Sequence, residues 1–434
     1  MVKKITLLFC LIYLFTCTAQ SGYTAIDTAN VAWRNKLKAA YNQRVAQTLL
    51  SFKNLPDKSY SKDLAASYAE INTEFTDKVN RGQFVQGPYY EDQINALLKK
   101  IASANPEYAS LASAQILLSF AETPNAYAMG DGFVVVNLPL FANVYTEDEV
   151  AFILCHELAH NLLNHPRNGL LEYVKLKNSS DIKKRTREIE KQKYNKGETA
   201  SNLFKKIVYA NRKRHREVEF QADSLGFVLY KNAFAGKESA ALKSFITLDD
   251  MDREKDSLLP VDYEKLFSSD KQPFNKEWIL GEEISKYKYD KTLKFWQIDS
   301  LKTHPDCADR AKRLQTVFKI GTENTEDPLP AYQDVVKRAK YDHLIGLFVL
   351  KEYGKSLYQS LLLLKYDPDN AYLRSMVHDA FLKIQEAQKN YTMNKYVDTM
   401  SPRYSYSYNT FLSFVRQLRK SEISEIINQY SVKK

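Results

Sequence analysis

Beyond its first 19 residues, the 434-residue chain has no apolar run as long as the roughly 18 residues that a membrane-spanning helix needs. We therefore expect a mature protein that is soluble or bound to a membrane only at its periphery. The chain also has no recognisable nucleic-acid-binding motif, and a formal net charge of +10 is a modest excess for its length. Nucleic acid is therefore not an expected partner. With 44% hydrophobic residues the chain can bury a core, which excludes a disordered protein and suits two or three domains.

Cysteine is scarce as well: the chain has four, and two of these lie in its N-terminal segment. Only Cys155 and Cys307 lie elsewhere. An exported compartment would permit a disulfide between them. The alternative, which we favour, is a pair of buried thiols, because an unbridged cysteine packs as a small apolar residue.

Residues 1–19 are typical of a signal peptide, with two lysines followed by an apolar stretch from Ile5 to Phe15. Cleavage after Ala19 would release the protein into an exported compartment, which we expect to be the periplasm or the periphery of an outer membrane, with secretion as a further possibility. The alternative is a lipoprotein signal in which Cys17 carries the lipid. We favour cleavage to a soluble form.

The chain carries the pattern H-E-x-x-H at residues 156–160, on an expected helix. His156 and His160 are four residues apart, so both imidazoles project from one face of the helix. Two neutral imidazoles at this spacing suit a tetrahedral Zn²⁺. Glu157 lies beside them, where it can take a proton from a water molecule on the metal. The alternative is an ordinary amphipathic helix that carries two histidines.

The sequence also predicts the limits of this helix. Thr146 and Glu149 have the spacing of a capping box, with Thr146 as the N-cap. Beyond the motif, the helix is expected to continue through His165. Since His165 is five residues beyond His160, it would lie about 140° further round the helix, so we interpret it as structural rather than as a metal ligand.

A second helical stretch carries Glu219 and Asp223, which are four residues apart beside an apolar stripe. Two carboxylates one turn apart on a core helix repel each other unless a cation or a donor lies nearby. A metal would resolve this: Glu219 would be the third zinc ligand, and Asp223 would orient a ligand histidine. The alternative is a pair of exposed acids that balance the arginines upstream.

A hairpin is predicted before the H-E-x-x-H helix. Gly130-Asp-Gly132 is a turn signal, and the segment after it is rich in β-branched residues. We expect this segment to be an edge strand beside the helix of the H-E-x-x-H motif. The backbone of this strand would pair with an extended substrate peptide. The alternative is a plain hairpin. The substrate-binding residues would be Phe133, Val134, Val135, Val136 and Asn137.

The last motif is Thr303-His-Pro-Asp-Cys-Ala-Asp-Arg310. His304 precedes a proline and is therefore steered away from the helical region into an extended conformation. Arg310 is expected to start a helix.

Taken in order, these motifs resemble those of the HtpX-like and CAAX-prenyl-protease-type zinc metalloendopeptidases. The matching elements are H-E-x-x-H, the E-x-x-A-D of residues 219–223 and the T-H-P-x-x-x-x-R of residues 303–310. The segment Asn125-Ala-Tyr-Ala also looks like the substrate-side strand of that family. The resemblance covers about residues 89–318.

The resemblance implies one zinc ion per chain and a role for each motif residue. The zinc ligands would be His156, His160 and Glu219, with Glu157 as the catalytic base. His304 would be either a fourth ligand in a resting state or a stabiliser of the oxyanion. Asp223 and Arg310 would contact the ligand side chains without binding the metal and would hold them in position.

The expected fold is α+β and mostly α, with a zincin-like catalytic domain, in which a small β-sheet lies beside the H-E-x-x-H helix, and a C-terminal α-helical domain. Since no membrane span is expected, the chain looks closest to the soluble exported, BepA-type branch. Its C-terminal part resembles a tetratricopeptide repeat, although only one repeat is recognisable. The expected divisions are a signal peptide (1–19), an N-terminal helical region (20–88), the peptidase domain (89–320) and the C-terminal helical domain (331–434).

These features together predict an exported zinc metalloendopeptidase that hydrolyses peptide bonds of proteins in envelope quality control. The alternative is a chaperone or assembly scaffold that binds an envelope partner through its C-terminal helices. Either way, the expected ligands are proteins or peptides. The physiological substrate, the oligomeric state and the resting position of His304 do not follow from the sequence.

Overall fold

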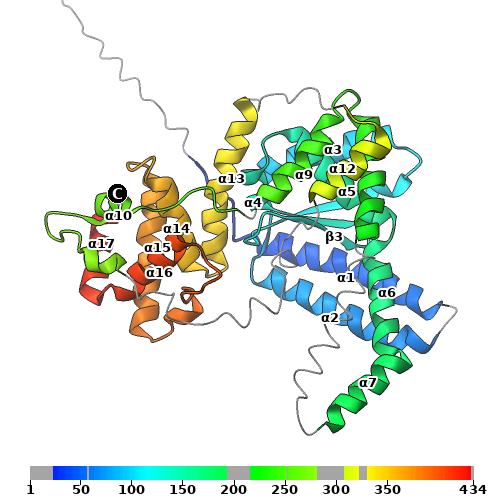
Figure 1. Cartoon of the computed structure of the whole chain (residues 1–434), viewed down its shortest axis with the longest axis horizontal. Coiled ribbons are helices and arrows are strands. Elements are labelled where there is room, and N and C mark those ends of the chain that lie inside the picture. The colour runs from blue at the N-terminus through cyan, green and yellow to red at the C-terminus, as the bar shows by residue number, and fades with distance from the viewer. Residues whose placement is uncertain are drawn as a thin grey trace, which may run out of the picture.

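A computed structural model of the chain describes residues 23–55, 58–192, 216–251, 253–280, 307–321 and 330–431. The predicted signal peptide, with Cys17, and the motif residue His304 lie outside the described residues. The described chain is mostly helical with a small mixed sheet, so the predicted fold class is confirmed (Figure 1). Within these ranges, no helix is both long and apolar enough to cross a membrane.

The sheet has four strands in the order β1-β2-β4-β3. Strands β2 and β4 are parallel, and the short β1 and the strand β3 add antiparallel at the two edges. The predicted turn joins β3 to β4, and its three residues all have positive φ, which suits the two glycines. The strands are β1 (Phe84–Val85), β2 (Gln115–Ser119), β3 (Ala126–Gly130) and β4 (Phe133–Asn137).

Helices cover both faces of the sheet (Figure 1). On one face lie α1 (Val31–Lys53) and α2 (Ser61–Asn80), which pack against each other. On the other face lie α3 (Pro88–Ala104), α4 (Leu138–Asn143) and α5 (Glu147–Leu162). The helix α5 carries the H-E-x-x-H motif, so this second layer contains the candidate site.

Strand β4 lies inside the sheet, so the prediction that Phe133–Asn137 forms an edge strand is wrong. Its main chain pairs with β2 on one side and with β3 on the other. Its side chains are buried on both faces: Phe133 and Val135 belong to the core with α1 and α2, whereas Val134 and Val136 belong to the core with α3 to α5. A continuous apolar run is typical of a strand that is covered on both faces. The edge beside α5 is β3.

The N-terminus of α5 is capped almost as predicted. Thr146 is the N-cap, and its hydroxyl accepts a hydrogen bond from the backbone N–H of Glu149 at 3.2 Å. The Glu149 carboxylate accepts one from the backbone N–H of Tyr145 at 3.3 Å, one residue earlier than in a standard capping box. These contacts satisfy backbone donors that a helix start would otherwise leave free.

The C-terminus of α5 differs from the prediction, because the helix ends at Leu162 instead of continuing through His165. Asn164 adopts a left-handed conformation with φ 55°, which turns the chain. A new helix, α6 (His165–Asn178), starts directly afterwards. It leads into α7 (Ser180–Lys191), which projects from the body of the molecule (Figure 1).

Three further helices complete the surroundings of α5. The helix that carries Glu219 is described over residues 216–233. Helix α9 (Ser239–Asp250) packs against α5, and α12 (Cys307–Phe318) packs against α9.

The C-terminal helices form a second core of their own, and this core also includes a segment from the predicted peptidase domain. Helix α10 and Trp278 of η3 pack there, while α13 contributes its first half to the core of α5 and its second half to this one. The elements are α10 (Pro260–Phe267), η3 (Lys276–Ile279), α13 (Pro330–Val349), α14 (Tyr353–Leu364), α15 (Ala371–Lys389), α16 (Tyr406–Gln417) and α17 (Lys420–Tyr430). Besides η3, the described residues contain the 3₁₀ helices η1 (Lys58–Tyr60), η2 (Ala109–Ser113) and η6 (Met393–Lys395).

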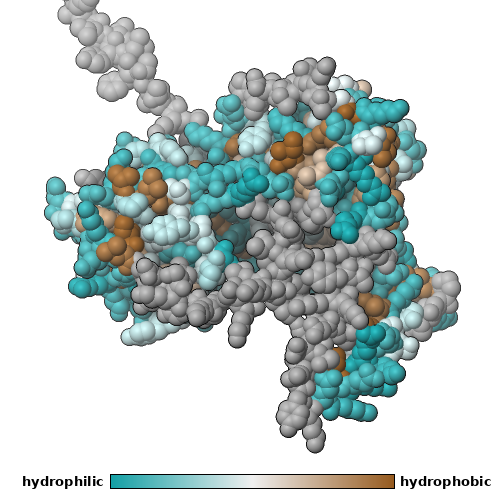
Figure 2. Space-filling model, viewed as in Figure 1, coloured by the Kyte–Doolittle hydropathy of each residue, from teal (hydrophilic) through white to brown (hydrophobic). Residues whose placement is uncertain are grey.

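On the face shown in Figure 2, hydrophilic residues predominate and hydrophobic residues occur in small groups. The largest of the exposed apolar side chains are spread over many elements rather than gathered on one. Single exposed apolar residues are normal on a folded protein.

Candidate metal centre

Helix α5 presents His156 and His160 on one face, as their spacing predicts. Their Nε2 atoms lie 3.1 Å apart. The helix is buried from Glu149 to Ala159, so its orientation is fixed by packing on most sides. The two imidazoles therefore point at a common position, and the packing of α5 holds them there.

Glu219 reaches the same position from the helix of residues 216–233. Its carboxylate oxygens lie 3.5 Å from Nε2 of His156 and 3.6 Å from Nε2 of His160. This approach depends on Gly226, because a Cβ there would lie 2.9 Å from the Cα of His156. The glycine lets the two helices touch at the first histidine. Sequence reasoning assigned it no role, although a glycine inside a helix is a signal of close packing.

The three side chains fit a zinc ion. Each offers one ligand atom, and these atoms all lie within 4.8 Å of one another. Zinc bonds of about 2.0–2.1 Å in a tetrahedron would place neighbouring ligand atoms roughly 3.3–3.4 Å apart, close to the separations found here. Two imidazoles and one carboxylate also form a donor set that zinc uses in hydrolases.

The far side of each imidazole is also engaged, which orients its Nε2 atom. Asp223 Oδ1 lies 2.9 Å from Nδ1 of His156. His165 Nδ1 lies 2.9 Å from Nδ1 of His160. The expectation that His165 faces elsewhere is therefore wrong, because the turn at Asn164 returns its ring to α5. A partner on Nδ1 leaves Nε2 as the atom directed at the metal position.

Arg310 of α12 binds both carboxylates of the neighbouring helix. Its Nε donates to Asp223 at 2.9 Å, and a terminal nitrogen donates to the other oxygen of Asp223 at 2.7 Å. A second terminal nitrogen lies 3.2 Å from Glu219. This two-pronged contact suits the planar guanidinium and resolves the repulsion between the two acids.

The electrostatics of the ligands favour a bound cation. Burial lowers the pKa of His160 to about 3, which keeps that imidazole neutral. Burial would also lower the pKa of His156, but the contacts with Asp223 and Glu219 raise it to about 10. Burial would raise the pKa of Glu219, but the hydrogen bond to His156 and the charge of Arg310 bring it well below its usual range. His156 thus holds a proton beside the ionised carboxylate of Glu219, in the place where a metal ion would replace it.

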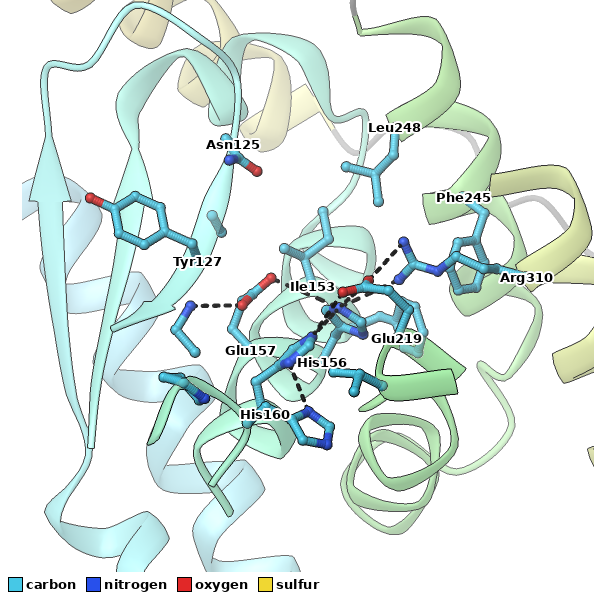
Figure 3. A pocket seen from close by; sticks show the side chains of 16 residues that line it. Asn125, Tyr127, Ile153, His156, Glu157, His160, Glu219, Phe245, Leu248 and Arg310 are labelled. Atoms are coloured by element: carbon cyan, nitrogen blue, oxygen red, sulfur yellow. Dashed lines mark hydrogen bonds and ion pairs between the residues drawn. The ribbon is translucent and has the colours of Figure 1, made fainter. Parts of the chain in front are cut away.

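Glu157 points to the opposite side, toward the sheet. Its carboxylate accepts a hydrogen bond from the backbone N–H of Ala128 in β3 at 2.8 Å (Figure 3). Burial raises the pKa of this carboxyl to about 7. A carboxylate with a near-neutral pKa is suited to exchange protons at neutral pH.

These residues lie at the floor of a cavity of about 350 Å³. One wall is the edge strand, from Asn125 to Ala128, and the opposite wall comes from α9 and Arg310 (Figure 3). The helix that carries Glu219 and the start of α6 complete the lining.

Comparison with protein-family models finds a match to Peptidase family M48 over residues 88–317, slightly more than half of the chain. The chain belongs to peptidase family M48. Comparison with curated proteins finds no significant match. The peptidase is thus a zinc-dependent enzyme in which His156, His160 and Glu219 form the metal-binding group.

Three sequence predictions about this M48 peptidase have different outcomes. His304 lies outside the described residues, so its position relative to the metal group stays a prediction. The five residues of β4 do not line the cavity, because both faces and both edges of that strand are covered. Cys155 and Cys307 are both buried and are not bonded to each other.

Proposed function

We propose that this M48 peptidase is an exported endopeptidase of the soluble BepA-type branch that cleaves extended segments of unfolded or misassembled envelope proteins. The observation that carries the proposal is the position of Glu157, which lies between the three ligand side chains and an edge strand that lines an open cavity. The same cavity thus contains a catalytic carboxylate and a site for an extended chain.

Glu157 is assigned the role of the general base. When bound, zinc makes a water molecule more acidic and polarises the carbonyl of the peptide bond. Glu157 takes a proton from that water and later gives it to the leaving amine. The N–H of Ala128 holds the carboxylate in place at 2.8 Å. A pKa raised by burial to about 7 lets the same group accept and release the proton near neutrality.

Strand β3 takes over the substrate-pairing role that the sequence analysis gave to β4. Its inner edge pairs with β4, whereas the backbone N–H groups of Ala128 and Gly130 point outward to side chains of α5. The outward edge near Ala126 lines the cavity. An extended peptide added there would form main-chain hydrogen bonds that do not depend on its sequence.

The residues behind the ligands are assigned supporting roles. Asp223 orients His156, and Arg310 fixes both Asp223 and Glu219. His304 is assigned to the oxyanion or to a resting metal contact, on the motif alone. Losing such a supporting partner typically lowers metal affinity or activity 10- to 100-fold, by the rough scale seen in other metal sites.

The test compares purified full-length wild type with Glu157→Gln and Glu219→Ala. We expect wild type to hold about one zinc per chain and to cleave an unfolded model protein. Glu157→Gln should keep the zinc and lose cleavage, because an amide cannot accept the proton. Glu219→Ala should lose zinc as well. Cleavage that persists in Glu157→Gln would contradict the assigned base.

The export expected from residues 1–19 needs a separate test. Mass spectrometry of the mature N-terminus from the exporting cell would show a chain that begins at Gln20, or a lipid on Cys17 if the alternative signal operates. A full-length chain recovered only from the cytoplasm would contradict export.

A chaperone or scaffold role is a second candidate, favoured by a larger cavity of about 600 Å³ where α13 and α15 meet the N-terminal Tyr23. Deleting the C-terminal helices would not test it, because α10 and α13 share their cores. We would instead ask whether full-length Glu157→Gln suppresses aggregation of an unfolded model protein at equimolar concentration. Aggregation at the rate of the protein-free sample would contradict this role.

A further inference from the structure

The segment between β2 and β3 leads the chain into the metal cavity, and the C-terminal helices contact it directly. Along this segment, the lining of the cavity begins at Asn125, the residue before β3. Three residues earlier, the carboxylate of Glu122 accepts a hydrogen bond from Nζ of Lys355 in α14 at 2.7 Å. The two residues lie 233 positions apart in the sequence, so this contact joins the C-terminal helices to the segment that enters β3.

A second contact fixes the beginning of the same segment. Phe120 follows β2 directly, is buried, and packs against Gly346 of α13. A Cβ at Gly346 would lie 2.5 Å from Cδ1 of the Phe120 ring, which is closer than two carbon atoms can approach without a bond. A glycine weakens a helix, and here it gives the ring room to lie against the backbone of α13. The end of β2 is therefore held in a fixed position relative to the C-terminal helices.

The sheet itself holds the other end of the segment. The side-chain amide of Asn137, at the end of β4, donates to the carbonyl of Thr123 at 2.9 Å. The backbone N–H of Asn137 donates to the carbonyl of Asn125, also at 2.9 Å. Asn137, which the sequence analysis placed among the substrate-binding residues, thus anchors the start of β3 from inside the sheet. The segment lies between this anchor and the C-terminal helices.

Glu122 is the nearest acid to Lys355, although two acids of the C-terminal helical unit are also close. Nζ of Lys355 lies 3.5 Å from Glu352 and 3.8 Å from Asp398, against 2.7 Å from Glu122. Burial would lower the pKa of Lys355, but the hydrogen bond to Glu122 and the charges of these acids raise it. The ammonium is therefore charged at neutral pH, and its closest contact is with the segment that leads to the cavity.

We propose that Lys355 is a positioning residue for substrate binding, which holds the start of β3 in place through Glu122. The inference rests on the proposed endopeptidase function, in which β3 pairs with an extended peptide. A looser strand must be ordered when the peptide binds, and this ordering costs binding free energy. Loss of the contact should therefore raise KM, whereas kcat is retained because the metal ligands and Glu157 are unchanged. The C-terminal helices thus form part of the unit that binds substrate.

The experiment is steady-state kinetics of the zinc-loaded full-length protein with one defined peptide. Glu122→Gln and Lys355→Met should each raise KM roughly two- to fivefold, the range that a partly exposed ion pair can supply, at nearly constant kcat. The double variant should be no worse than either single variant, because both remove the same contact. Lys355→Arg should restore most of the wild-type KM, since it keeps a cation beside Glu122.

The matched control is Glu352→Gln, which neutralises a different acid beside Lys355. The side chains of Glu122 and Glu352 are similarly exposed, 49% and 42%, but Glu352 belongs to the C-terminal helices. Glu352→Gln should leave KM unchanged. Equal KM values in Glu122→Gln and Glu352→Gln overturn the proposal, as do additive effects of Glu122→Gln and Lys355→Met in the double variant.

Hydrogen exchange of the same samples, followed by mass spectrometry, gives a measurement that does not depend on cleavage. The backbone of residues 120–128 should exchange faster in Glu122→Gln than in wild type or Glu352→Gln. Exchange at the wild-type rate in Glu122→Gln overturns the proposal. If this segment does exchange faster but the zinc-loaded wild type cleaves no peptide, the contact stands and the proposed endopeptidase function is contradicted instead.

Discussion

His165 Nδ1 lies 2.9 Å from His160 Nδ1, and this contact defines the tautomer of a zinc ligand. The other ring nitrogen of His165 lies 3.2 Å from Oε1 of Gln221. Since a carbonyl oxygen can only accept, Nε2 of His165 must donate to it. Nδ1 of a neutral His165 is then an acceptor, so Nδ1 of His160 donates and its Nε2 keeps the lone pair for the metal. Burial lowers the pKa of His165, which favours the neutral ring that this arrangement needs.

His165→Ala should therefore weaken zinc binding without removing a ligand. We expect zinc affinity to fall roughly 10- to 100-fold, the usual cost of losing such a partner. Competition with a calibrated chelator measures it on the full-length chain. The matched control is His378→Ala on α15, where Nδ1 of the histidine lies 2.9 Å from a carboxylate oxygen of the neighbouring Asp379. Equal zinc affinity in His165→Ala and wild type would show that His165 does not hold the tautomer.

Gly226 permits the contact between the Glu219 helix and α5. Gly226→Ala should therefore disturb the metal centre, although Gly226 is not itself a ligand. The added Cβ would lie 2.9 Å from the Cα of His156, which forces the helices apart. We expect a loss of about 1–3 kcal/mol in the free energy of unfolding, typical of overpacking, together with weaker zinc binding.

Chemical denaturation of the metal-free chain and zinc titration would measure these two effects. The control is Gly169→Ala in α6, where an added Cβ meets nothing within 4 Å. There alanine should be neutral or stabilise by up to about 1 kcal/mol, because it restricts the unfolded chain. Equal stability of the Gly226 and Gly169 variants would contradict the close-packing argument.

The sequence predicted the metal ligands well because they depend on short-range geometry. Histidines four apart on a helix must share a face, and Thr146 and Glu149 indicate where that helix begins. Glu219 could be proposed because two acids on a core helix need a counter-charge. That role then required a long-range contact, which only the structure supplies.

The predictions about β4 and His165 were wrong because contacts between distant parts of the chain determine their positions. The edge assignment of β4 overlooked its own composition, since Phe133-Val-Val-Val has no polar alternation and therefore indicates burial on both faces. The position of His165 depends on a left-handed Asn164, which no helical periodicity reveals. Phe245 and Leu248 look like ordinary core residues of an amphipathic helix, and only the packing of α9 against α5 places them at the cavity.

His343 of α13 should make stability depend on pH in the acidic range. Burial lowers its pKa from 6.5 to about 4. Because the pKa of His343 is lower in the folded state, the unfolded state binds a proton at a higher pH than the folded state does. The contribution is fully present above the unfolded pKa of 6.5 and is lost as pH falls through the folded pKa of about 4. The loss is at most about 3.5 kcal/mol, given roughly 1.4 kcal/mol per pKa unit.

The measurement is the free energy of unfolding of wild type and His343→Gln from neutral pH to below pH 4. Other groups titrate in both proteins, so the difference between the two curves isolates His343. We expect wild type to lose stability relative to the variant as pH falls. His378→Gln controls for the removal of a histidine as such. If the free energies of unfolding of wild type and His343→Gln change in parallel with pH, burial of this ring is not the cause of the pH dependence.

Asn161, the residue after the second zinc-binding histidine, holds the edge strand against α5. Its amide nitrogen donates to the carbonyl of Phe133 at 3.0 Å, and its oxygen accepts from the N–H of Gly130 at 3.1 Å. This side chain therefore fixes both ends of the β3–β4 turn. If β3 pairs with substrate, Asn161→Ala should raise KM several-fold more than it lowers kcat, because a looser strand binds peptide less well. Zinc content should not change, since the Asn161 amide bonds to the backbone of the β3–β4 hairpin at Gly130 and Phe133.

Steady-state kinetics with one defined peptide would measure this split between KM and kcat, with zinc analysis of the same samples. Asn161→Asp keeps the acceptor for Gly130 but loses the donor to Phe133, so its KM should lie between those of wild type and Asn161→Ala. Asn168→Ala is the control, because its amide makes an exposed bond to Leu163 outside the cavity. A lower kcat at constant KM would instead show that Asn161 acts on the metal group, and β3 would lose its role as the surface that binds the substrate.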